Sequence, residues 1–158
     1  MSKIYIIHEN PQWFAPLAKV FRAHKLPYGE INMAGGVLDM AKAPPEGIFF
    51  SKMSASSYTR GHLNSPDYTF ALLTWLESHG RRVINGSPVL RLEISKIDQY
   101  VRLQKSGLNV PHAVACFGKD EILAAAKRFK APFILKPNRG GKGIGVQLFQ
   151  SHRMLEEY

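Results

Sequence analysis

The sequence predicts an α/β fold in two parts, and three features of the chain indicate it. Between residues 3 and 85, short apolar segments rich in β-branched and aromatic residues alternate with longer amphipathic segments. An Asn-Gly-Ser-Pro turn at residues 85–88 predicts a boundary between domains of residues 1–87 and 88–158. Beyond it, a glycine-rich stretch joins two apolar segments, which is typical of an antiparallel hairpin.

The first part is predicted to contain four strands and two helices. The strands are residues 3–7, 28–33, 47–50 and 82–85. The first helix has one apolar face, formed by Trp13, Phe14, Leu17, Val20, Phe21 and His24. The second helix starts at the Ser-Pro-Asp sequence of residues 65–67. The order β-α-β-β-α-β predicts a parallel or mixed sheet with helices on both sides.

The second part is predicted to be an α+β subdomain with helices on one side of an antiparallel sheet. Residues 94–105 and 120–129 have helical periodicity, and a third helix starts at residue 151. The helix of residues 120–129 should point Ile122, Leu123, Ala126 and Phe129 inward. Residues 110–117, 133–137 and 144–149 are predicted strands.

Composition excludes several classes of protein. The 158 residues are 45% apolar and 21% charged, which is typical of a soluble folded protein, and no apolar stretch is long enough to span a membrane. The single cysteine, Cys116, excludes an intramolecular disulfide, and with no export signal we expect a cytoplasmic protein. The net charge of +9 fits a solvated basic face, an acidic ligand or a polyanion.

The candidate chemistry lies in the glycine-rich stretch and the lysines near it. Residues 140–145 contain four glycines, but they match neither a Walker A loop nor a dinucleotide-binding fingerprint. A glycine turn exposes backbone N–H groups, and Lys136, Arg139 and Lys142 add positive charge, so phosphate is the expected ligand. A flexible hairpin turn with solvated charges, and a Lys136 side chain that simply reaches water, are the alternatives.

Four motifs in order carry a resemblance to a known family. They are the Ser95-Lys96 pair that opens a helix, the Gly-Leu-Asn-Val-Pro sequence of residues 107–111, the Phe-Ile-Leu-Lys-Pro sequence of residues 133–137, and the glycine-rich residues 140–146. The chain thereby resembles the ATP-grasp superfamily, most of all its RimK-type glutamate ligase branch. The resemblance implies a small pre-ATP-grasp-like α/β domain, residues 1–87, followed by the first ATP-grasp subdomain, residues 88–158.

The resemblance also implies a function and the residues that serve it. ATP-grasp ligases use ATP and Mg²⁺ to convert a carboxylate to an acyl phosphate, which an amine then attacks. The implied nucleotide-binding residues are Lys96, Lys136, Arg139, Gly140, Gly141, Lys142, Gly143, Ile144 and Gly145. The catalytic residues and the acid and amine substrates stay open.

The chain departs from the family in its length. ATP-grasp proteins of this type continue well beyond the glycine loop, so we expect an N-terminal fragment that is inactive alone, with a mobile glycine loop. The Mg²⁺ ligands would lie in the missing C-terminal half. Apolar surface left exposed by its absence predicts a homodimer.

Other residues are assigned no role. The six histidines show no metal-ligand spacing and should lie at the surface or at helix ends, and Cys116 should be a buried small side chain in a strand. The polar segment of residues 51–64 is a connector or faces a substrate. Two alternatives to the ligase remain: an ATP-binding regulatory module without ligation, and a basic nucleic-acid-binding protein, which the lack of dense Lys/Arg runs makes the weakest.

Overall fold

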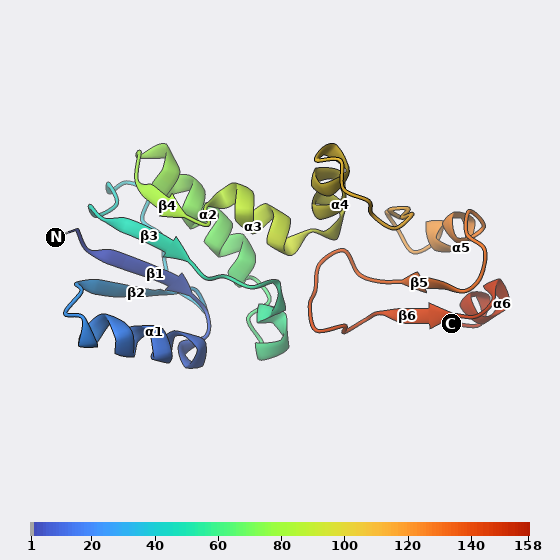
Figure 1. Cartoon of the computed structure of the whole chain (residues 1–158), viewed down its shortest axis with the longest axis horizontal. Helices are drawn as coiled ribbons and strands as arrows, with labels where there is room; N and C mark the ends of the chain where they lie inside the picture. Colours follow the sequence, from blue (N-terminus) through green and yellow to red (C-terminus); the bar gives the residue numbers. More distant parts are fainter. Residues whose placement is uncertain (1) are drawn as a thin grey trace. The chain divides into compact units, whose positions relative to one another are not determined.

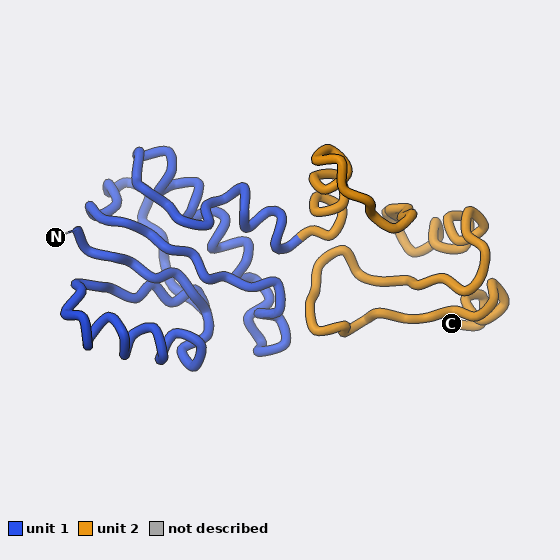
Figure 2. The backbone as a smooth tube through the Cα atoms, in the orientation of Figure 1, with its two compact units in different colours: residues 1–94 blue, residues 95–158 orange. Residues whose placement is uncertain are grey.

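The computed structural model describes residues 2–158 (Figure 1). The chain divides into two compact units, residues 1–94 and residues 95–158, coloured blue and orange in Figure 2. The division follows Ile94 rather than the turn at residues 85–88, because a helix that the sequence did not reveal, α3 (Ser87–Ile94), packs into the first unit through the buried Leu90. Within residues 2–158, no helix is both long and apolar enough to cross a membrane.

The first unit is built on a parallel sheet, as predicted. Its strand order is β2-β1-β3-β4, and all three pairings are parallel. The strands are β1 (Ile4–His8), β2 (Tyr28–Asn32), β3 (Ile48–Ser51) and β4 (Arg82–Ile84). Successive side chains of a strand point to opposite faces, so Ile6 and Ile7 of β1 are both fully buried only because both faces of the sheet are covered.

Helices cover the two faces of this sheet. On one face, α1 (Pro11–Ala23) packs Phe14 and Ala18 against Ile6. On the other, α2 (Ser65–Ser78) and α3 pack against Ile7 and Phe49, with Leu73 and Leu76 of α2 fully buried (Figure 1). The predicted arrangement of helices on both sides is therefore confirmed.

The predicted apolar face of α1 was partly wrong. Trp13 and Val20 are about half exposed, whereas Phe14 is buried. Residues 13 and 14 differ by about 100° around a helix, so only one of the two aromatic rings can point at the sheet. Instead, Trp13 lies under the Arg60 guanidinium, whose central carbon is 4.7 Å from the ring centroid.

The polar segment after β3 is folded around a buried carboxylate. It contains a 3₁₀ helix, η1 (Ala55–Arg60), and Glu9 at the end of β1 is only 2% exposed. Arg60 Nε donates hydrogen bonds of 3.1 Å to both Glu9 carboxylate oxygens, and Arg60 Nη2 also pairs with Glu9. His62 Nδ1 lies 2.7 Å from Glu9 Oε2. Burial raises the pKa of Glu9, but the hydrogen bonds and charges of Arg60 and His62 outweigh it and lower the pKa overall.

His8 differs from the prediction that the histidines lie at the surface or at helix ends. His8 at the end of β1 is 3% exposed, and its Nε2 lies 2.9 Å from Glu30 Oε1 on the neighbouring strand β2. The register pairs His8 with Asn32 and Ile6 with Glu30, so the His8–Glu30 contact is diagonal, and it cannot be read from the sequence until the register is known.

The second unit contains helices and one antiparallel hairpin. The helices are α4 (Lys96–Lys105), α5 (Glu121–Ala126) and α6 (His152–Glu156), and the strands are β5 (Phe133–Leu135) and β6 (Gln147–Phe149). Phe133 pairs with Phe149 and Leu135 with Gln147, which confirms the antiparallel hairpin. A small core forms where Ala126, Phe149 and Leu155 meet.

Several details of the second unit differ from the sequence prediction. Residues 110–117 are not a strand, because they pair with neither strand of the hairpin and Pro111 has no N–H group to donate. Leu123, expected to point inward, is 45% exposed because α5 is only six residues long and buries Ala126 instead.

Candidate functional site

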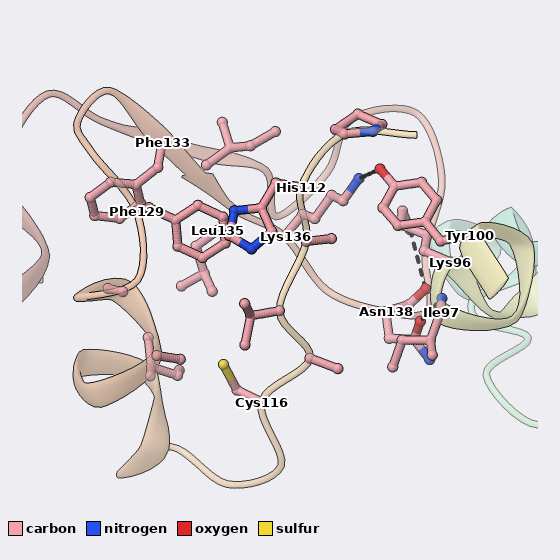
Figure 3. A pocket seen from close by; sticks show the side chains of 18 of the residues that line it. Lys96, Ile97, Tyr100, His112, Cys116, Phe129, Phe133, Leu135, Lys136 and Asn138 are labelled. Carbon is pink, nitrogen blue, oxygen red and sulfur yellow. Dashed lines mark hydrogen bonds between the residues drawn. The ribbon is translucent and has the colours of Figure 1, made fainter. Parts of the chain in front are cut away.

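A cavity of about 820 Å³ lies within the second unit. Its walls come from α4, residues 111–116, α5 and β5 with the residues that follow it. Lys96, Tyr100, Lys136 and Asn138 form a polar group, and Figure 3 shows them apart from the apolar and aromatic side chains around Cys116 and Phe129. Much of the remaining wall consists of small side chains, which include Ala113, Ala115, Ala125 and Ala126.

Lys136 follows the last residue of β5 and is half-buried. Its Nζ donates a hydrogen bond of 2.6 Å to the hydroxyl of Tyr100 and lies 4.8 Å from the centroid of the same ring (Figure 3). The lysine therefore does not simply extend into water, which was the alternative interpretation of this residue. Its ammonium is held by an uncharged side chain at the wall of the cavity.

Lys96 is the first residue of α4 and lines the same cavity. Its Nζ donates to the backbone carbonyls of Asn138, at 3.3 Å, and Gly140, at 3.2 Å. Burial lowers the pKa of Lys96 and the charge of Lys136 lowers it further, while Tyr100 acts in the opposite direction, so the pKa is lowered overall. Two ammonium groups at the wall of one cavity create a positive potential that favours an anion.

Asn138 attaches the start of the glycine-rich stretch to α4. Its backbone carbonyl accepts from the N–H of Lys96 at 3.2 Å, and its side-chain Oδ1 accepts from the N–H of Ile97 at 2.9 Å. Its Nδ2 donates to Ser95 Oγ at 3.3 Å. The first turn of a helix has N–H groups without partners inside the helix, and Asn138 satisfies one of them with its side chain.

The glycine-rich stretch is a tight turn rather than a continuous strand. Lys142, Gly143 and Gly145 have positive φ values of 59°, 72° and 76°. Turn hydrogen bonds run from Ile144 N to Gly141 O and from Val146 N to Gly143 O, both 3.2 Å long. The predicted strand at residues 144–149 is accordingly shortened to β6.

The structure thus brings part of the predicted site together. Lys96, Lys136 and Gly145 line the cavity, whereas six predicted residues are not among those that form its wall within residues 2–158: Arg139, Gly140, Gly141, Lys142, Gly143 and Ile144. Cys116, expected in a buried strand, lies half-exposed at the wall. Tyr100 and Asn138 were missed. The position of Tyr100 four residues after Lys96, on the same helix face, was the available signal.

The second unit has no evident metal site. Within residues 2–158, no three His, Cys, Asp or Glu side chains gather as metal ligands would. The residues at the cavity are cationic or neutral, which is the wrong chemistry for Mg²⁺ and the right chemistry for phosphate.

Comparison with known proteins identifies the fold. No family model and no curated protein matches the chain in sequence. An ATP-grasp RimK domain protein from Sphaerobacter thermophilus matches with a TM-score of 0.70 and 21% identity, over 99% of this chain and 56% of that one. N5-carboxyaminoimidazole ribonucleotide synthetase from Thermotoga maritima matches with a TM-score of 0.63 and 16% identity, over 100% and 44%.

A further match is an ADP complex of an N5-carboxyaminoimidazole ribonucleotide synthetase, with a TM-score of 0.62 and 18% identity over 99% of this chain and 43% of that one. The chain therefore has the α/β fold of the N-terminal portion of ATP-grasp proteins, as the motifs predicted. It spans about half the length of the solved structures that it matches.

Proposed function

We propose that this chain is the nucleotide-binding part of an ATP-dependent ligase that joins a carboxylate to an amine. The observation that carries the proposal is the meeting of Lys96 and Lys136 at one cavity, beside the start of the glycine-rich turn. The match to ATP-grasp folds over nearly the whole chain supports it. The cavity could hold a base among its apolar side chains while the two lysines meet the phosphates.

In the proposed reaction, a carboxylate oxygen attacks the γ-phosphorus of ATP, which gives an acyl phosphate and ADP. An amine then attacks the acyl carbon, so that an amide forms and phosphate leaves. Lys96 and Lys136 would bind and orient the phosphates, and N–H groups of residues 140–145 would stabilise charge on the phosphoryl oxygens. Since residues 2–158 show no metal-ligand cluster, the Mg²⁺ that the resemblance implies would need ligands from outside this chain.

The finer parts of the proposal go beyond the fold. Glutamate or another amino acid is the proposed substrate class, the cytoplasm the proposed location, and a homodimer the proposed state of the isolated chain. In the second unit, Ile134 and Leu148 pair across β5 and β6 and are each more than half exposed, which supports a surface available for association. Sedimentation velocity would test the dimer.

Calorimetric titration of this chain with ATP tests nucleotide binding. Lys136→Met keeps the length of the side chain but removes its charge, and it should weaken ATP binding about tenfold or more. Lys105→Met, at the exposed C-terminal end of α4, is the matched control and should bind ATP as the original chain does. An RNA oligonucleotide should not compete with ATP.

Three results would contradict the proposal. Unchanged ATP affinity in Lys136→Met would show that Lys136 does not contribute to nucleotide binding. Binding of RNA but not ATP, with a steep dependence on salt, would instead indicate a polyanion-binding surface. Ligation itself is tested on the longest form of the protein that the gene encodes, by release of ADP that requires both a carboxylate and an amine. ATP binding without such release would indicate a regulatory nucleotide-binding module.

A further inference from the structure

Tyr100 places an uncharged hydroxyl against the Lys136 ammonium at the wall of the cavity. It lies one helical turn after Lys96 on α4, and its hydroxyl oxygen accepts the hydrogen bond of 2.6 Å from Lys136 Nζ (Figure 3). We propose that Tyr100 is a positioning residue that holds the Lys136 ammonium where it meets the phosphate groups of a nucleotide. This inference rests on the proposed function and adds a specific residue to it.

Lys136 needs a partner to stay at the cavity. Its ammonium is carried on four flexible CH₂ groups, and fixing such a side chain loses much rotamer freedom. Lys96 lines the same cavity, and its positive charge repels a second ammonium there. Without an acceptor, the half-buried Lys136 would gain by turning its ammonium into water.

The Tyr100 hydroxyl keeps the Lys136 ammonium at the cavity without neutralising its positive charge. A carboxylate in its place would hold Lys136 more strongly, but it would repel phosphate. An ammonium has three N–H donors, so one bond to Tyr100 leaves two for phosphate oxygens.

The aromatic ring makes a separate contribution. Its centroid lies 4.8 Å from Lys136 Nζ, within the range in which a ring attracts a cation. Tyr100→Phe keeps this ring and removes only the hydroxyl. The substitution therefore isolates the hydrogen bond, and the contact of the ring with the rest of α4 and the cavity is preserved.

The test compares ADP with adenosine, which lacks phosphate. In Tyr100→Phe, ADP affinity should fall about tenfold, as expected for a hydrogen bond to a charged group, while adenosine affinity stays the same. Introduced into Lys136→Met, the same substitution should have no further effect on ADP, because the group that it positions is gone. Tyr158→Phe, at a tyrosine that is 77% exposed, is the control and should change neither affinity.

A measurement without nucleotide completes the test. In ¹⁵N-labelled protein, the Lys136 ammonium should give an NMR signal slowed in exchange by its hydrogen bond, and Tyr100→Phe should abolish it while Tyr158→Phe leaves it intact. If the original chain binds no ADP, the proposed function fails. If the original chain binds ADP but the Tyr100→Phe variant binds ADP equally well or better, only the positioning role is overturned. The same holds if Tyr100→Phe weakens the binding of adenosine by the same factor as the binding of ADP.

Discussion

Replacing Asn138 by alanine tests how the glycine-rich turn is attached to α4. The substitution removes the 2.9 Å bond to the Ile97 N–H and the 3.3 Å bond to Ser95 Oγ. Both bonds are solvent-exposed, and Ser95 still caps the helix through the Asp98 N–H at 3.2 Å, so we assign the loss about 1 kcal/mol, the usual value for one helix cap.

Amide hydrogen exchange followed by NMR is the appropriate assay, because it reports on single N–H groups. In Asn138→Ala, exchange at Ile97 should accelerate about fivefold, which corresponds to about 1 kcal/mol, while amides of the first unit keep their rates. Asn109→Ala, at an exposed position in the loop after α4, is the matched control and should leave Ile97 unchanged.

Asn138→Asp separates the attachment of the glycine-rich turn to α4 from the effect of a charge on nucleotide binding. Aspartate keeps an acceptor for the Ile97 N–H and places a negative charge at a helix N-terminus, which is favourable, so exchange at Ile97 should stay slow. The same charge beside Lys96 should weaken ATP binding. Unchanged exchange in Asn138→Ala, or rapid exchange in Asn138→Asp, would refute the capping role.

Two further predictions concern stability. Glu9→Gln should lower the free energy of unfolding at pH 7 by about 3 kcal/mol in urea titrations, because Arg60 and His62 lose their buried carboxylate. The folded-state pKa of Glu9 lies below its ordinary value of 4.5, so its contribution is fully present above pH 4.5 and the difference from Glu9→Gln should shrink as the pH falls below it; a constant difference would contradict this. Gly145→Ala should lower stability by about 1 kcal/mol in thermal unfolding, because φ is +76° there and a Cβ atom would lie 3.2 Å from Pro137. Gly35→Ala, with nothing within 4 Å, is the control, and equal effects at the two glycines would argue against backbone strain.

The sequence contained enough to predict the sheet of the first unit. Adjacent buried isoleucines in β1, such as Ile6 and Ile7, require cover on both faces, and alternation of strands with helices provides it. The hairpin of the second unit followed in the same way from two apolar segments around glycines. Patterns of this kind are local, so a single chain reveals them without knowledge of its tertiary contacts.

Contacts between residues far apart in the sequence could not be predicted from such local patterns. Glu9 and Arg60 are 51 residues apart, and nothing in the polar segment around Arg60 indicates that it folds over a buried carboxylate. Residues 110–117 have the composition of a strand, but a strand also needs a neighbour with free backbone groups, and the hairpin does not pair with them. At the cavity, order along the chain indicated the two lysines but not Tyr100, whose hydroxyl matters only because β5 brings Lys136 beside it.

The alanines along the cavity wall imply a conflict between thermal stability and the space available for a ligand. A larger apolar side chain at a half-buried wall position such as Ala125 would bury more apolar surface, and added apolar burial usually raises the melting temperature. The same change would shrink the volume of about 820 Å³ in which a base could lie. Variants selected only for heat resistance should therefore accumulate bulk at these alanines and lose affinity for nucleotides, so a library screened for both properties would map the boundary of the pocket residue by residue.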